Sequence, residues 1–249
     1  HLRVGTFQFF AARGEASRLR KLADYAIARH DPDLTGAPDR YLTFLQRVAQ
    51  RQVRLVAQWM GVGFVHGVMN TDNTTISGES IDYGPCAFMD RFDDQTVFSS
   101  IDHTGRYAYG NQPGIILWNL SRLAETLLGL IDSDTDRAIA RATEVLEHAR
   151  DQYRAAWLGV FADKLGLEQP DADLIDGMHR LWDGQNVDFT SFFRALPDAL
   201  VGDDAGLRAL FDDPSGLDVW LFAYRRAAGP QAGALVAARN PVYIPRNHL

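Results

Sequence analysis

The sequence predicts a mostly α-helical fold in which one long irregular segment interrupts the helices. Apolar residues recur at the spacing of amphipathic helices over most of the chain. This periodicity stops between residues 66 and 112, where Asn, Asp and Gly residues typical of turns are frequent. An irregular segment of that length inside a domain is usually functional or disordered. Its aromatic residues, among them Phe88 and Tyr109, favour function.

Composition places the chain among globular proteins and argues against nucleic-acid and membrane partners. It has 249 residues, of which 46% are apolar and 23% charged, which excludes a disordered or low-complexity chain. A single cysteine, Cys86, excludes an intrachain disulfide. The net charge of −7 argues against a nucleic-acid partner, because binding to phosphates needs a basic face. No uninterrupted apolar stretch approaches the ~18–20 residues that span a bilayer, so no membrane partner is expected.

The periodic segments predict the individual helices. Their ranges are 19–27, 41–61, 113–130, 139–161, 171–182, 189–196 and 216–228. Gly61 is expected to end the second helix, and the apolar run 62–65 fits a strand that packs closely against its surroundings. Pro113 suits the first turn of the next helix, because a proline there loses no helical hydrogen bond. The tryptophans in these patterns are expected in the core: Trp118, Trp157, Trp182 and Trp220.

The irregular segment contains residues at the spacing of a protein-kinase metal site. Asn73 follows His66 by seven positions, and Asp82-Tyr83-Gly84 comes shortly after. Protein kinases have His-Arg-Asp, four residues and Asn, and further on Asp-Phe-Gly. That Asn and the second Asp hold Mg²⁺, a hard cation that prefers amide and carboxylate oxygens. The spacing therefore predicts that Asn73 and Asp82 are metal ligands.

One position departs from the kinase pattern. Two residues after His66, where a kinase has the Asp that acts as its catalytic base, this chain has Val68, which cannot accept a proton. The nearest carboxylate is Asp72, immediately before Asn73. A chain that keeps the metal ligands and moves the base is either an inactive kinase or an enzyme with a different reaction.

Segments across the whole chain resemble the selenoprotein O family. They are residues 66–73 with 81–85, 3–7, 105–107, 111–113 with 118–120, and 240–241 with 246–247. Members of that family are pseudokinases by sequence that bind ATP in a flipped orientation and transfer AMP to protein hydroxyl groups. The resemblance implies that Asp72 is the proton acceptor and that Asn73 and Asp82 are the metal ligands. It also implies that Asp82 lies against the nucleotide phosphates.

This resemblance implies a protein-kinase-like fold and an ATP-dependent adenylyltransferase that uses Mg²⁺, with Mn²⁺ as an alternative. A Ser, Thr or Tyr hydroxyl of a partner protein attacks the α-phosphorus, and pyrophosphate leaves. The family's glycine-rich loop and ATP-contacting lysine precede the matched region. We therefore expect residues 1–249 to form one domain, the C-terminal helical lobe, without the N-terminal lobe. In this lobe a catalytic and activation-like segment, about 61–113, separates helical bodies 1–60 and 114–249.

Several expectations accompany this interpretation. We expect the chain alone to bind ATP weakly and to be inactive, and a bacterial cytosol is favoured over a mitochondrion. His66 is expected to brace the loop, and Lys21 and Lys164 lie in helical patterns outside a nucleotide site. Two alternatives remain open. One is a catalytically inactive pseudokinase that acts as a binding module, and the other is a phosphotransferase that uses Asp72 as a relocated base.

Overall fold

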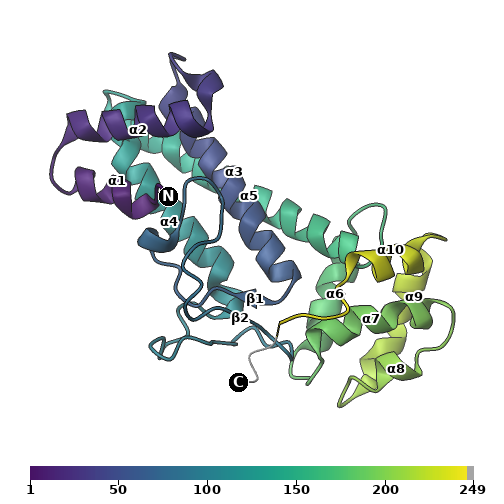
Figure 1. Cartoon of the computed structure of the whole chain (residues 1–249). Helices are drawn as coiled ribbons and strands as arrows, with labels where there is room; N and C mark the ends of the chain where they lie inside the picture. The colour runs from purple at the N-terminus through teal and green to yellow at the C-terminus, as the bar shows by residue number, and fades with distance from the viewer. Residues whose placement is uncertain (246–249) are drawn as a thin grey trace. The chain divides into compact units, whose positions relative to one another are not determined.

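Helices account for most of residues 1–245, which are the part of the chain that the computed structural model describes (Figure 1). This confirms the predicted mostly α-helical class. Residues 246–247, which belong to the family resemblance, lie outside the described residues.

All seven predicted helices are present, with nearly the expected bounds. The helices are α1 (Val4–Ala11), α2 (Ala16–His30), α3 (Arg40–Gly61), α4 (Gln112–Ile131), α5 (Thr135–Lys164), α6 (Ala172–Trp182), α7 (Phe189–Leu200), α8 (Ala205–Arg208), α9 (Leu217–Ala227) and α10 (Ala232–Arg239). Three of them, α1, α8 and α10, have no counterpart in the prediction. They are too short to show the repeat over 11–18 residues on which periodicity depends.

Contacts divide the chain into two compact units, each built from discontinuous segments. Unit 1 consists of residues 1–56, 68–84 and 111–154, and unit 2 consists of residues 57–67 and 85–110 and the chain from Ala155 onward. The catalytic and activation-like segment predicted over 61–113 therefore contributes to both units. The prediction of a single domain over residues 1–249 stays a prediction.

Unit 1 has an apolar core formed by α1, α2, α3, α4 and the first part of α5. On α4, the buried residues Leu120, Leu123 and Leu127 recur at helical spacing and share one face. Within residues 1–245, the helical stretch 109–131 is the one segment long and apolar enough to cross a membrane by length and composition. Its apolar face belongs to the core of unit 1.

Unit 2 contains the two strands of the described chain. Strand β1 (Phe64–Val65) pairs antiparallel with β2 (Ala87–Phe88). The helix before β1 ends at Gly61, as predicted, and a β-carbon built there would lie 2.2 Å from Val160 Cγ1 of α5. This glycine therefore permits the close approach of α5 to the end of α3. At Gly63, just before β1, a β-carbon would lie 3.0 Å from Met89 Cγ, which agrees with the close packing predicted around residues 62–65.

Three of the four tryptophans expected in the core are buried: Trp157, Trp182 and Trp220. The prediction for Trp118 is wrong, because this side chain is 41% exposed. Successive helical residues are about 100° apart around the axis. Asn119, the next residue, faces the interior with no exposed surface, so Trp118 is turned toward the solvent.

A lysine at the end of α5 is buried in unit 2. Lys164 Nζ donates to Asn240 Oδ1 at 2.7 Å and lies 3.9 Å from the centre of the Phe193 ring. Asn240 Nδ2 in turn donates to the Lys164 carbonyl at 2.8 Å. No carboxylate compensates the charge among these contacts, and burial lowers the pKa of Lys164 to about 7.

This pKa makes the stability of the protein depend on pH. An unfolded lysine has a pKa of about 10.4, so between pH 7 and that value the unfolded chain binds a proton that the folded chain lacks. We expect the free energy of unfolding to rise with pH across this window, by up to about 4–5 kcal/mol. Below pH 7 the lysine is protonated in both the folded and the unfolded state, so the folded protein is destabilised by the full cost of burying the charged ammonium.

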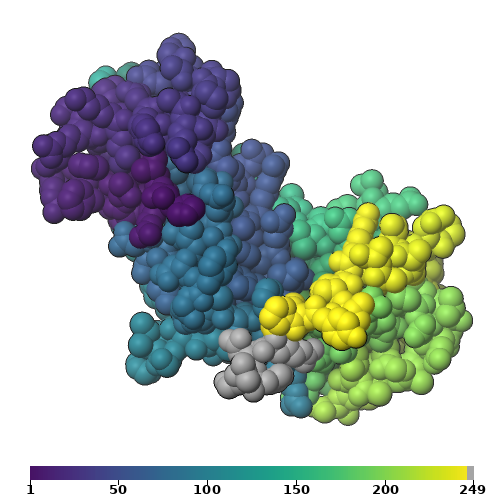
Figure 2. Space-filling view, in the orientation of Figure 1, coloured from purple at the N-terminus to yellow at the C-terminus, as the bar shows by residue number. Residues whose placement is uncertain are grey.

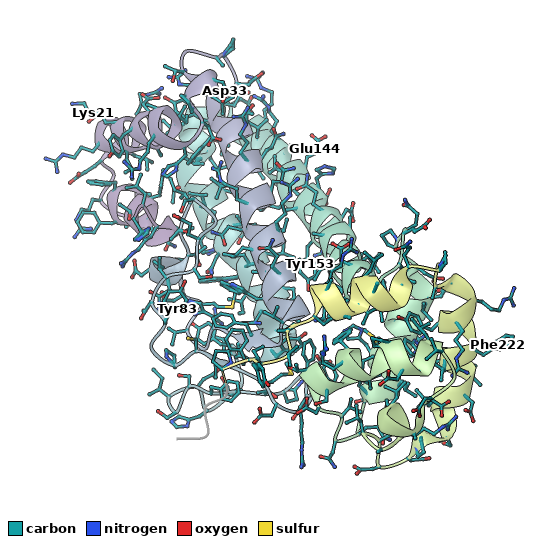
Figure 3. The ribbon with its side chains drawn as sticks, turned by 45° about the vertical axis from the view of Figure 1, so that its right-hand side comes forward. Lys21, Asp33, Tyr83, Glu144, Tyr153 and Phe222 are labelled. Atoms are coloured by element: carbon teal, nitrogen blue, oxygen red, sulfur yellow. The ribbon has the colours of Figure 1, made fainter. Side chains whose placement is uncertain are left out.

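Urea unfolding at pH 7 and pH 9.5 checks this expectation. Lys164→Met is expected to remove most of the rise, because it replaces the buried ammonium with an apolar group of similar length. The matched control is Lys21→Met, since Lys21 projects from α2 into solvent (Figure 3). An equal pH dependence in the native protein and in Lys164→Met would contradict the prediction.

Candidate active site

Two of the three predicted site residues, the proton acceptor Asp72 and the metal ligand Asn73, lie in a short 3₁₀ turn of unit 1, η2 (Thr71–Asn73). The Oδ1 atom of Asn70 accepts hydrogen bonds from the backbone N–H groups of Asp72 at 2.9 Å and Asn73 at 3.0 Å. This side-chain cap fixes the backbone from which both side chains project. Asn73 Nδ2 donates to the Val68 carbonyl at 3.0 Å, which leaves Oδ1 as the amide atom able to bind a cation.

The segment after η2 is held by backbone pairing with the beginning of the chain. The N–H of Val4 donates to the Thr74 carbonyl at 2.9 Å, and the N–H of Ile76 donates to the Leu2 carbonyl at 3.1 Å. In Figure 2 the first residues, in the darkest purple, accordingly lie against the blue atoms of this segment. The start of α1 is therefore a fixed wall beside η2.

The same segment is also bound to α3. Gln52 Nε2 donates to the Thr75 carbonyl, and Arg51 Nε donates to the Ile76 carbonyl at 3.1 Å. The Thr75 hydroxyl closes the following turn, because it donates to the Glu79 carbonyl at 2.9 Å and accepts from the Glu79 N–H at 3.0 Å. These bonds determine the path of the chain toward the second predicted carboxylate.

A buried asparagine of α4 ties both sides of η2 to the core. Asn119 Nδ2 donates to the Met69 carbonyl at 2.9 Å and to Thr74 Oγ1 at 2.8 Å. The side chain has no exposed surface. Buried polar groups need such partners, so these two bonds place the turn relative to a rigid helix.

Asp82 has an unusual backbone conformation. Its φ is 58°, in the left-handed region, and among the described residues 1–245 every other residue with positive φ is a glycine. An L residue there costs about 1–2 kcal/mol, although Asp and Asn tolerate it better than most. Asp82 is exposed on an irregular loop, and its neighbour Tyr83 is labelled in Figure 3. Strain of this kind gathers at functional sites, so it is an independent reason to assign a function to Asp82.

The chemistry of these side chains suits a hard cation. Asp72 and Asp82 are exposed, and within residues 1–245 neither carboxylate takes part in a hydrogen bond or an ion pair. In the described part of the chain, no three His, Cys, Asp or Glu side chains form a metal cluster. A divalent cation held by Asn73 and Asp82 would take its further oxygen ligands from phosphate and water.

All three predicted residues belong to unit 1, two in η2 and the third after the closed turn. Their convergence on a single cation stays a prediction. His66 lies in unit 2, is 1% exposed and packs against the Trp59 ring at 5.3 Å between centroids. Its burial agrees with the structural role that we expected.

Two residues that support the site have no role in the sequence interpretation, although both lie in segments that carry the family resemblance. Asn119 was included in the family resemblance without a role, and the signal that points to it is a polar residue on the apolar face of a predicted helix. The other is Gly5 in the first turn of α1, against which the Asp72 carboxylate lies. Gly5 belongs to the resembling segment 3–7, but its residue type gives no signal for a contact with Asp72.

A comparison with known protein families shows the family to which this chain is related. The family described as protein adenylyltransferase SelO matches residues 1–208 of this chain. The chain belongs to this family. The SelO match includes η2, Asp82 and Asn119, so the whole candidate site lies inside the matched region.

Curated relatives support this assignment and are bacterial proteins. Protein nucleotidyltransferase YdiU of Cereibacter sphaeroides (strain KD131) is 55% identical over 251 residues. Its namesakes in Mycobacterium sp. (strain KMS) and Rhizobium etli are 55% identical over 253 residues and 51% identical over 260 residues. Each alignment covers 100% of this chain and 52% of the relative. The chain thus spans about half the length of the SelO-family relatives that it matches.

Proposed function

We propose that the protein containing this chain transfers AMP from ATP to Ser, Thr or Tyr hydroxyl groups of partner proteins. The chain would supply the proton acceptor and the metal ligands from the helical lobe of a protein-kinase-like fold. Membership of the SelO family and similarity to proteins named nucleotidyltransferase support the reaction class. The observation that carries the site assignment is the left-handed backbone of Asp82, a conformation that only a few residue types tolerate. The bacterial relatives support a cytosolic bacterial enzyme.

The proposed reaction is an in-line displacement at the α-phosphorus. A bond forms between the substrate hydroxyl oxygen and this phosphorus, and the bond from phosphorus to the oxygen that bridges to the β-phosphate breaks. Pyrophosphate leaves with that oxygen. Asp72 accepts the hydroxyl proton and orients the oxygen for attack. An exposed carboxylate on a capped turn suits this role, because its backbone is fixed while its oxygens remain accessible.

The cation site in the proposal consists of Asn73 and Asp82. The amide of Asn73 presents its oxygen because its nitrogen is bound to the Val68 carbonyl, and Asp82 contributes a carboxylate. Amide and carboxylate oxygens are suitable ligands for Mg²⁺, and Mn²⁺ accepts the same donors. When bound, the cation would neutralise negative charge on the phosphate oxygens of ATP.

Labelled ATP tests the proposal in the full-length protein. We expect label at the α-phosphate, but none at the γ-phosphate, to pass to protein substrates in the presence of Mg²⁺ and to be lost with EDTA. Transfer of the γ-label would overturn the proposal in favour of a phosphotransferase that uses Asp72 as its base. Nucleotide binding without transfer of either label would instead identify a non-catalytic binding module.

A further inference from the structure

The space beside Gly5 can hold either the carboxylate of Asp72 or a side chain at position 5, but not both. A β-carbon built on Gly5 would lie 2.0 Å from Asp72 Oδ1 and 2.9 Å from its Cγ atom. Real β-carbons do not approach other heavy atoms this closely. The carboxylate of Asp72 therefore occupies the position that the side chain of any other residue at position 5 would need.

The surroundings restrict the ways in which such a clash is relieved. The Asp72 backbone is bound to Asn70 Oδ1 at 2.9 Å, and the first turn of α1 is bound to η2 through Val4 N–H and the Thr74 carbonyl at 2.9 Å. Asn119 holds Thr74 from the other side. The built β-carbon would also lie 3.4 Å from Asp72 Cα. Because both backbones are held, the side chain of Asp72 is the part that must rotate away.

We propose that Gly5 is a positioning residue for Asp72. The absence of a side chain at the start of α1 allows the carboxylate to lie in the orientation from which it accepts the substrate proton. This inference rests on the proposed role of Asp72 in AMP transfer and adds the requirement that position 5 remain glycine. A misplacement of about 1 Å in a reacting group can lower a rate by about 10²-fold, so we expect a single methyl group at position 5 to have a large effect.

Matched substitutions of two helical glycines test the proposal in the full-length protein. We expect Gly5→Ala to lower kcat for AMP transfer about 10²-fold. The KM for ATP is expected to stay within about twofold, because the metal ligands are unchanged. Gly129→Ala on α4 is the control, since a β-carbon there has no heavy atom within 4 Å. Equal activity of the two variants would overturn the proposal.

A double-mutant cycle with Asp72→Ala gives a readout that does not depend on activity. With Asp72 present, Gly5→Ala is expected to give no rise in the thermal unfolding midpoint, because the cost of rotating the carboxylate away offsets the gain in helix propensity. In the Asp72→Ala background the same change is expected to raise it slightly, because alanine favours a helix more than glycine does. Gly129→Ala is expected to raise the midpoint in both backgrounds.

The two proposals fail in different ways. Additive effects in the stability cycle would overturn the inference about Gly5 and leave the proposed function intact. Strong coupling together with normal AMP transfer by Asp72→Ala would show that the contact exists and that Asp72 is not the proton acceptor. That second result would overturn both the role of Asp72 and the purpose assigned to Gly5.

Discussion

Replacement of Asp82 by asparagine is expected to lower AMP transfer by about 10²–10³-fold and to weaken Mg²⁺-dependent nucleotide binding. The substitution removes one negative charge and keeps the size of the side chain. It also keeps a residue type that tolerates the left-handed backbone, so we expect no loss of folding stability. Initial rates with α-labelled ATP, calorimetric titration of nucleotide with and without Mg²⁺, and the thermal unfolding midpoint measure the three quantities.

Two further substitutions separate the charge of Asp82 from its backbone. Asp82→Gly removes the carboxylate and accepts φ of 58° without strain, whereas Asp82→Ala removes it and adds strain. Both are expected to lose transfer, and only Asp82→Ala is expected to lose stability, by about 1 kcal/mol. Glu144→Gln, a change to an exposed acid of α5, is the control with unchanged transfer (Figure 3). Normal transfer by Asp82→Gly would remove this residue from the site.

Replacement of Asn119 by leucine is expected to weaken both the fold and the site. The two side chains are similar in size, but leucine leaves the Met69 carbonyl and the Thr74 hydroxyl without the donor that now pairs with them. The Thr74 hydroxyl keeps its bond to the Asn70 carbonyl at 3.1 Å, so the loss of the partner of the Met69 carbonyl sets the cost, about 1–3 kcal/mol. Because these bonds hold both sides of η2, we also expect AMP transfer to fall roughly 10–100-fold.

A second buried polar residue of α4 provides the control for Asn119→Leu. The Thr126 hydroxyl donates to the Leu123 carbonyl at 2.7 Å, so its bond stays within the helix. Thr126→Val keeps the shape and removes that bond, and we expect it to leave transfer unchanged. Urea unfolding measures stability, and rates are compared at a temperature at which all variants are folded. Equal effects of the two substitutions on transfer would show that Asn119 has no special connection with η2.

The secondary structure could be predicted where its signal is local and long. Helices α3 and α5 repeat an apolar pattern over many turns, and Gly61 marks the end of α3. The short helix α1 gives no such repeat, although its first turn forms one wall of the candidate site. Burial could not be predicted from residue type alone. Trp118 is a large apolar residue in a helical pattern, yet it is exposed because its neighbour Asn119 lies on the interior face of the helix.

Residue identities and their spacing were enough to predict the family, the mostly helical class and the candidate metal ligands Asn73 and Asp82, with Asp72 beside them. The features that support those residues could be seen only in three dimensions: the bonds from Asn119, the close approach of Gly5 and the left-handed backbone at Asp82. Spacing along a chain is a local property that residue identities record directly. Which distant residues meet depends instead on how helices pack, and a glycine or an asparagine has the same letter whether or not another segment lies against it.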